Sequence, residues 1–388
     1  MKILVGSPVH QKPNILNHFL KSLLNLNKEN IELHYLFVDD NESIDSMLIL
    51  EQFSKLEKNV TIYKSESSEH YDCNEETHIW NEQLIWKVAN FKNMILRIAE
   101  DFEFDYLFLI DSDLVLHPDT LQQLLRVEKD IISNIFWTKW QPDFPELPQV
   151  WLFDQYQQYN FSRGEVITEK ELIDRNKEFL SMLRNPGVYE VGGLGACTLI
   201  SKNAIKKGVN FSEIKNISFW GEDRHFCIRA QALGMKLYVD THYPAYHIYR
   251  ECDLINVPEY NLSLNNQTEV ALLEDLVING MESLGTFHYK NGYPHDWKQY
   301  FSEEIKSSLL SEMDKEYKNT VENKIIVNAT ILNTDIEMDA NRIYARFSMM
   351  NDGVQNGLHF MDEVQGIIYF SKGNNQQWLI DSIAIEEN

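Results

Sequence analysis

Two aspartates separated by one serine directly follow the apolar and aromatic run YLFLI at 106–110. Two carboxylates held at the end of a buried strand can coordinate a hard divalent cation. Such a cation would be required if the substrate were a diphosphate, because the phosphates must be screened from the negative charge of the protein. Asp111, Ser112 and Asp113 are therefore predicted to bind a metal ion and a diphosphate. The alternative is a solvated acidic turn.

A histidine far along the chain offers a second kind of ligand for the same cation. His247 follows an apolar strand predicted at 236–241 and a turn that contains Pro244. A mixed set of carboxylate and imidazole ligands favours manganese over calcium. His247 is therefore a predicted metal ligand, and a purely structural histidine is the alternative.

An acidic pair opens the helix predicted at 220–234, directly after an aromatic residue and a glycine. A carboxylate at Asp223 or Glu222 could act as a general base. Trp220 and Gly221 would let a sugar ring approach and stack, so we place both on the acceptor side of a site. The alternative is structural, because the helix dipole favours acidic residues in a first turn without any catalytic role.

A second pair of aspartates, Asp39 and Asp40, ends another apolar strand. A carboxylate in this position can accept hydrogen bonds from a nucleotide base or ribose. The alternative is a helix N-cap formed by Asp40 or Asn41.

The glycines of GGLGAC at 192–197 lead into a strand and not into a helix. They are therefore not a dinucleotide or phosphate-loop fingerprint. Gly193 is expected instead to let the backbone lie against a ligand on the acceptor side.

The elements that must position these residues alternate between strand and helix over the first two thirds of the chain. Strands are predicted at 2–6, 33–38, 59–63, 105–110, 131–137 and 236–241, and helices at 14–26, 44–57, 77–100, 118–129, 168–184 and 220–234. Asn14 is the expected cap of the first helix, and 244–250 is an expected loop. This alternation predicts an α/β fold with a mostly parallel sheet, helices on both faces, and ligands at the carboxyl ends of the strands.

The pattern changes after about residue 258, where two helices at 266–284 and 297–317 precede long runs of alternating residues. Helices followed by consecutive strands predict a separate α+β domain with an antiparallel sheet. We therefore expect one domain at 1–258 and a smaller accessory domain at 259–388.

Composition excludes several classes of function. The 388 residues include 35 basic and 59 acidic side chains, a formal net charge of −24, which disfavours binding to nucleic acid or to anionic membranes. No apolar stretch approaches the ~20 residues of a membrane helix. The four cysteines form no CxxC pair, which gives no support to a zinc-ribbon or thioredoxin fold. Sparse, unpaired cysteines fit a reducing compartment better than a secreted disulfide scaffold. The sequence thus predicts a cytoplasmic protein.

Together these segments resemble glycosyltransferases of the GT-A fold, family-two type. The resemblance covers about 1–255 and rests on ILVGSP, FVDDN, the Lys92-Asn93 pair, LFLIDSDLVLHPDTL, VGGLGACTLISKNAI and FWGEDRHFCIRAQALGMKLYVDTHYPAYHI. One departure is SPVH at 7–10, which replaces the commoner Thr-x-Asn turn. The QxxRW motif of processive synthases is absent, so a non-processive enzyme is expected.

The resemblance implies a role for each matching residue. Donor-binding residues would be Ser7, Pro8, Asp40, Lys92, Asp111, Ser112 and Asp113. Within this set Asp40 would contact the nucleobase, Asp111 the ribose and the metal-bound diphosphate, and Asp113 the metal directly. Asp223 would be the general base of an inverting reaction, assisted by Glu222, and His247 would complete the metal site with Asp113 and Asp111.

The implied function is a hexosyltransferase-type enzyme that uses Mn²⁺ or Mg²⁺ and a nucleotide-diphosphate sugar, with a UDP-sugar favoured. The acceptor stays open between a peptide, a saccharide and a small molecule. Residues from about 260 resemble a nuclear-transport-factor-two-like domain, which implies acceptor recognition or self-association into a homo-oligomer. Two alternatives remain: a non-catalytic protein that binds nucleotide sugars, and a nucleotidyltransferase, for which SPVHQKPN lacks the expected glycine-rich loop.

Overall fold

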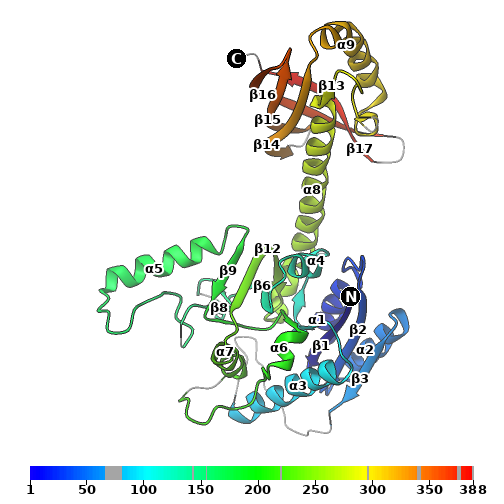
Figure 1. Ribbon diagram of the computed structural model, residues 1–388. Helices are drawn as coiled ribbons and strands as arrows, with labels where there is room; N and C mark the ends of the chain where they lie inside the picture. Colours follow the sequence, from blue (N-terminus) through cyan, green and yellow to red (C-terminus); the bar gives the residue numbers. More distant parts are fainter. Residues whose placement is uncertain are drawn as a thin grey trace. The chain divides into compact units, whose positions relative to one another are not determined.

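The chain divides into two compact units in the computed structural model, Met1–Tyr260 and Asn261–Asn388 (Figure 1). The structure describes residues 1–65, 81–141, 144–153, 155–218, 221–294, 297–338, 342–373 and 377–386. Within these ranges, no helix has both the length and the apolar composition that crossing a membrane requires.

The first unit is built on one large sheet with the strand order β3-β2-β1-β4-β11-β6-β12-β5. Its strands are β1 (Lys2–Val9), β2 (Glu32–Asp39), β3 (Val60–Lys64), β4 (Tyr106–Leu109), β5 (Leu114–Val115), β6 (Ile131–Thr138), β11 (Thr198–Ser201) and β12 (Leu237–His247). The strands β3, β2, β1 and β4 run parallel, as do β6 and β12, while β11 lies antiparallel between β4 and β6.

Short strands extend this sheet near its edge. β7 (Leu147–Pro148) pairs with β6, and β9 (Val188–Val191) pairs with β12. A separate two-stranded sheet joins β8 (Val150–Trp151) to β10 (Gly193–Leu194). The segment that includes β7 and β8 therefore contains short paired strands.

Helices cover both faces of the large sheet, each over its own apolar core. The helices α1 (Pro13–Leu24), α2 (Ile44–Leu56) and α4 (Thr120–Arg126) pack on one face, and α3 (Glu82–Asp101), α5 (Glu169–Met182), α6 (Lys202–Lys206) and α7 (Glu222–Ala232) contribute to the core on the other. Alternation within β1 divides it between the cores, with Ile3 and Val5 in one and Leu4 in the other. The predicted fold class, a mostly parallel sheet between two helical layers, is confirmed.

Some predicted boundaries differ from the structure. The helix α1 begins at Pro13 with Lys12 in the N-cap position, so Asn14 lies inside the helix and is not its cap. Proline suits a first helical position because its missing N–H has no intrahelical partner there. The start of the helix predicted at 77–100 lies partly outside the described residues, and α3 begins at Glu82.

The strand β12 is longer than predicted and continues to His247, so the first part of the expected loop at 244–250 is strand. Its pairing with β6 shifts register between Asp240 and Ala245. Pro244 cannot donate to a ladder, and an irregularity of this kind accommodates it. Beyond the shift, His247 lies opposite Leu114 of β5.

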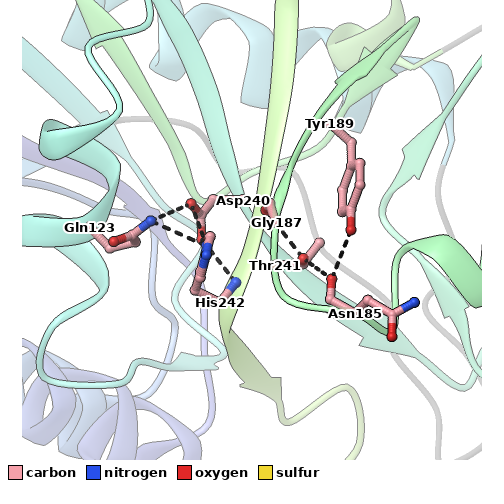
Figure 2. Close-up of polar contacts among 7 residues, drawn as sticks. All are labelled: Gln123, Asn185, Gly187, Tyr189, Asp240, Thr241 and His242. Atoms are coloured by element: carbon pink, nitrogen blue, oxygen red, sulfur yellow. Dashed lines mark hydrogen bonds and ion pairs between the residues drawn. The ribbon is translucent and has the colours of Figure 1, made fainter. Parts of the chain in front are cut away.

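Polar contacts anchor β12 on both sides just before this irregularity (Figure 2). The buried Asp240 carboxylate accepts hydrogen bonds from Gln123 Nε2 at 2.9 Å and from the backbone N–H of His242 at 3.0 Å. The hydroxyl of Thr241 donates to the carbonyl oxygen of Asn185 at 2.6 Å. The strand that carries His247 is thereby tied to α4 and to the segment before β9.

The second unit contains one antiparallel five-stranded sheet in the order β13-β14-β15-β16-β17 and helices packed on it. Its elements are the continuation of α8 (Val257–Gly285), β13 (Phe287–His288), a short 3-10 helix (Trp297–Tyr300), α9 (Glu303–Glu322), β14 (Ile326–Met338), β15 (Ile343–Gln355), β16 (Leu358–Lys372) and β17 (Trp378–Ile385). The core includes Val277, Trp297, Phe347 and Ile368. This architecture confirms the predicted smaller α+β fold.

We predict that Asp240→Ala lowers the free energy of unfolding by on the order of 2 kcal/mol, because the half-buried donors on Gln123 and His242 lose their acceptor. Urea denaturation followed by tryptophan fluorescence measures the change. The exposed Asp174 in α5 serves as the control, since Asp174→Ala should change stability by less than about 0.5 kcal/mol. Equal stability of the two variants would show that the Asp240 contacts do not hold β12.

Candidate active site

A cleft of about 1460 Å³ opens at the carboxyl ends of β1, β2, β4, β6 and β12 in the first unit. Ten of the residues predicted from the sequence line it: Pro8, Asp40, Lys92, Asp111, Ser112, Asp113, Gly221, Glu222, Asp223 and His247. These residues come from segments far apart along the chain. Parallel strands bring them together because their carboxyl ends meet at one edge of the sheet.

Strand pairing brings the second aspartate of the DSD segment to His247. Asp113 directly precedes β5, and β5 pairs with the end of β12. The carboxylate Oδ2 of Asp113 lies 3.5 Å from Nε2 of His247. The backbone carbonyl of Asp113 also accepts a hydrogen bond from the N–H of Ile248 at 2.9 Å. The two predicted metal ligands therefore face each other across adjacent strands.

The other ring nitrogen of His247 has a polar partner that fixes the orientation of the imidazole. Nδ1 lies 2.9 Å from the hydroxyl of Thr138, which also accepts a hydrogen bond from Gln149 Nε2 at 3.1 Å. Phe136 packs edge-on against the same ring, with the centroids 5.1 Å apart. Such contacts direct Nε2 toward Asp113, as outer partners do for metal-binding histidines.

The chemistry of this pair fits a divalent cation. A carboxylate oxygen and a neutral imidazole nitrogen are a donor set that manganese accepts, with further positions left for substrate oxygens and water. Among the described residues, no three side chains of His, Cys, Asp or Glu form a cluster that could hold a metal ion. The participation of Asp111 as a further ligand therefore stays a prediction.

A buried lysine holds the acidic pair at the start of α7. Nζ of Lys92 lies 2.9 Å from Glu222 Oε1 and 2.9 Å from Asp223 Oδ1. The exposed fraction of the side chain is 1% for Lys92, 12% for Glu222 and 24% for Asp223. Lys92 thus clamps both carboxylates while leaving Asp223 the most accessible of the three.

A glycine in β1 permits the close packing that brings Lys92 to this position. A Cβ at Gly6 would lie 2.3 Å from Cγ2 of Ile95 on α3, well inside van der Waals contact. The helix α3 therefore lies close on the sheet, and Lys92 sits one turn before Ile95. The N-cap of α7, Gly221, has a φ of 104°, a conformation that glycine adopts without strain.

Burial and like charges shift the pKa values of the acidic residues in this cluster. Burial raises the pKa of Asp223 to about 7; Lys92 opposes the rise, and Glu222 adds to it. Burial likewise raises the pKa of Asp111 to about 6. Burial disfavours the charged form of Lys92, but the nearby carboxylates outweigh it and raise the pKa of Lys92 well above its ordinary value. At neutral pH Asp223 can therefore both hold and release a proton.

The end of β2 carries a second buried ion pair. Asp40 Oδ2 lies 2.8 Å from Nζ of Lys87 and 3.5 Å from Nδ1 of His10. Burial alone would raise the pKa of Asp40, but hydrogen bonds from His10, Lys87 and Ser65 bring it below its ordinary value. Asp40 is therefore held as an ionised acceptor at the edge of the cleft. The N-cap alternative does not apply, because Ser43 caps α2.

Two cationic residues of the site were missed in the sequence. Lys87 pairs with Asp40, and Arg250 lines the cleft three residues after His247. The Arg250 guanidinium is buried and lies 3.5 Å from Asp253 Oδ2. Within the described part of the chain, its Nε and Nη1 atoms are buried and make no hydrogen bond. The available signals were a lysine among the apolar residues of a predicted helix and an arginine three residues after a predicted metal-ligand histidine.

Two of the predicted residues that the structure describes, Ser7 and Gly193, do not line the cleft. Ser7 is buried in β1, where its hydroxyl donates to the carbonyl of Pro8. Gly193 is also buried, and a Cβ there would lie 2.0 Å from the indole of Trp151. The close approach that Gly193 permits is thus to Trp151, which itself lines the cleft. Trp220 lies outside the described residues.

No family model matches the chain, and no curated protein matches it. Solved structures with similarity include TarS residues 1–349 of S. aureus in complex with UDP, at 16% identity and a TM-score of 0.37, covering 63% of this chain and 60% of that one. Another is the mannosyltransferase PcManGT of Pyrobaculum calidifontis in complex with GDP-Man and Mn²⁺, at 10% identity and a TM-score of 0.38. This match covers 63% of this chain and 56% of that one.

A third similar structure covers a smaller part of the chain. It is an IcmL-like type IV secretion system protein of Legionella pneumophila, at 17% identity and a TM-score of 0.26, covering 30% of this chain and 91% of that one. This chain spans 60% of the TarS structure.

We predict that Lys92→Met lowers the free energy of unfolding by about 3–5 kcal/mol at alkaline pH, because Glu222 and Asp223 are left as an uncompensated buried pair. The folded pKa of Asp223, about 7, lies above its unfolded value, so the folded protein binds more protons between these values. Ionising Asp223 thus costs stability as the pH rises. The loss should be largest above pH 7 and smaller at about pH 5.

Lys87→Met is the matched control on the same helix. Asp40 keeps the hydrogen bonds from His10 and Ser65 that lower its pKa, so it stays ionised at mildly acidic pH. The stability loss in this variant should therefore depend less on pH between about 5 and 8. Urea denaturation of both variants across this range makes the comparison. An equal pH dependence in the two variants would contradict the shifted pKa of Asp223.

Proposed function

We propose that the first unit is a metal-dependent glycosyltransferase that moves a sugar from a nucleotide-diphosphate sugar to an acceptor. One observation carries the proposal. A single cleft holds the Asp113–His247 pair, whose Oδ2 and Nε2 atoms lie 3.5 Å apart, and the carboxylate of Asp223, which is paired with the buried Lys92. The Asp113–His247 pair suits a cation-bound diphosphate, and the Asp223 carboxylate suits a general base. Metal-dependent transfer with inversion uses both groups in one place.

Asp113 and His247 are the residues proposed to hold Mn²⁺ or Mg²⁺, with Asp111 as a further ligand. The chemistry supplied by such an ion when bound is Lewis-acid stabilisation of the negative charge on the departing diphosphate. Thr138 and Gln149 would keep the imidazole of His247 in position for this role.

Arg250 is proposed to bind the diphosphate oxygens directly. A buried guanidinium with Nε and Nη1 lacking hydrogen bonds within the described residues has donors to offer a ligand. Hydrogen bonds from arginine to phosphate are charge-assisted and strong. Because negative charge on the diphosphate grows as the sugar departs, these bonds would strengthen toward the transition state.

Asp40 is proposed to bind the nucleobase. Its lowered pKa keeps it ionised, so it would accept a hydrogen bond from a ring N–H such as that of uracil. The ammonium group of Lys87 balances the charge of Asp40, so the cost of burying this carboxylate is already offset before the nucleotide binds. A UDP-sugar is the proposed donor.

Asp223 is proposed to take the proton from the acceptor hydroxyl. The acceptor oxygen attacks the anomeric carbon from the face opposite the diphosphate, a new C–O bond forms, and the bond from the anomeric carbon to the phosphate oxygen breaks. The reaction would pass through an oxocarbenium-like state with inversion. Glu222 and Lys92 would position Asp223 and set its pKa. The second unit is proposed to serve acceptor recognition or self-association.

We predict that the rate of transfer falls as the pH drops through about 7, because Asp223 must be deprotonated to act as a base. Asp223→Asn should lower kcat by about 10²–10⁴-fold and leave donor KM nearly unchanged. Initial rates with UDP-sugar donors between pH 5 and 9 provide the profile.

Glu251→Gln is the control for Asp223→Asn, because Glu251 also lines the cleft but pairs with Lys12 at 2.8 Å. This variant should retain activity and the same pH profile. If the residual activity of Asp223→Asn still falls as the pH drops through about 7, the general base is another group. A product that keeps the anomeric configuration of the donor would exclude inversion.

A thermal-shift screen of nucleoside diphosphates, with and without Mn²⁺, tests donor binding. A ligand that binds only the folded state raises the apparent stability. We expect a shift with UDP that requires Mn²⁺ and is lost in Asp113→Asn. A shift without any hydrolysis or transfer of donor would favour the non-catalytic binding protein. Incorporation of nucleoside monophosphate into product would favour the nucleotidyltransferase.

A further inference from the structure

Charge is divided unevenly around the cleft. The charged lining residues Asp111, Asp113, Glu222, Asp223 and Arg250 lie around the proposed donor and base positions. In contrast, none of the described lining residues between positions 136 and 176 carries a charge. That stretch contributes one wall, here called the amide–aromatic wall: Trp140, Gln155, Tyr156, Gln158, Tyr159 and Asn176.

Large aromatic rings in this wall stay partly exposed while contacting other side chains. Tyr156 is 49% exposed and Trp140 is 39% exposed. The guanidinium of Arg224 stacks on the Tyr156 ring, 3.3 Å from its centroid, and the Trp151 ring meets it edge-on at 4.7 Å. Aromatic surface that is held in place and left open in a cleft is suited to stacking against a flat apolar face of a ligand.

The backbone at Tyr156 is also strained. Its φ of 61° lies in the left-handed region, which bulky residues seldom adopt. Such conformations persist only where the surroundings enforce them, and they gather at ligand-binding sites. The strain at Tyr156 thus agrees with the idea that this ring is placed for a ligand.

Amide side chains interleave with these rings. Within the described part of the chain, the amides of Gln155 and Gln158 make no hydrogen bond, and Asn176 uses only Nδ2, which donates to the carbonyl of Leu172. Each amide presents a donor and an acceptor together. Groups of this kind match hydroxyls, which also donate and accept, and they offer no charge to a phosphate.

The wall adjoins the proposed base. A Cβ at Gly221 would lie 3.3 Å from the hydroxyl oxygen of Tyr156, and Gly221 directly precedes Glu222 and Asp223. A ligand stacked on Tyr156 would therefore bring its hydroxyls close to the start of α7. An acceptor for the transfer reaction has to satisfy this condition.

We infer that the amide–aromatic wall is the acceptor subsite and that the acceptor is an uncharged saccharide. Its C–H faces stack on Tyr156 and Trp140, and its hydroxyls pair with Gln155, Gln158 and Asn176. None of the wall residues themselves is a cation; Arg224 lies at the wall but stacks on the Tyr156 ring, and a phosphate-bearing acceptor would also face Glu222 and Asp223. This inference rests on the proposed glycosyltransferase function and adds the chemical class of its acceptor.

The test compares acceptors of different charge with the full chain, Mn²⁺, and UDP-glucose, UDP-N-acetylglucosamine and GDP-mannose as donors. The acceptors are lactose, cellobiose, maltose and chitobiose, the same sugars carrying a phosphate, and peptides containing Ser and Thr. Saturation-transfer difference NMR records binding of each acceptor independently of turnover. We expect binding of, and transfer to, at least one uncharged disaccharide and neither with its phosphorylated form.

The double variant Gln155→Ala/Gln158→Ala should raise acceptor KM by about tenfold or more, as expected for the loss of two hydrogen bonds, without changing donor hydrolysis. Phe144→Ala is the control, since Phe144 is 57% exposed in the same segment but does not line the cleft. Three results would overturn the inference. No uncharged disaccharide binds, phosphosugars or peptides are preferred, or the acceptor KM of the double variant is unchanged. Absence of donor hydrolysis in the parent would count against the proposed function, while NMR binding still decides the inference.

Discussion

The candidate site depends on one buried cation between two carboxylates. Lys92 is almost fully buried, and it contacts Glu222 and Asp223 from a helix distant from both in sequence. A lone lysine in this position would cost several kcal/mol of desolvation, and an unpaired acidic pair would cost as much. The contact therefore requires α3 and α7 to be held together, and Gly6 permits this by letting α3 lie close on β1. The same balance of charges leaves Asp223 with a pKa near neutrality.

The second constraint is the path of β12. A strand that ended where its first ladder ends would leave His247 in a loop. The shift of register after Asp240 instead lets the strand continue and pair with β5, next to Asp113. Hydrogen bonds at Asp240 and Thr241 fix the strand before the shift, and Thr138 fixes the imidazole after it. The closeness of the two proposed metal ligands, Asp113 and His247, is thus a product of strand pairing.

These constraints give the cleft two chemically different parts. One part concentrates ionisable groups whose pKa values depend on one another, and it suits a charged, cation-associated donor. The other part carries amides and open aromatic rings, and it suits a polar but uncharged partner. The division also matters for a protein with a net charge of −24, because an anionic substrate can bind only where a local cation such as Arg250 offsets the field.

Periodicity and composition alone determined the layers of the first unit, the antiparallel sheet of the second, and the acidic clusters at strand ends, because these follow from local alternation of apolar and polar residues. The short DSD and GED segments could be recognised as chemical groups for the same reason. What the sequence could not decide was which distant side chains meet. Lys92 with Asp223 and Lys87 with Asp40 are contacts across long sequence separations that the sequence did not predict. Helix packing and strand register decide them, and neither leaves a local pattern along the chain.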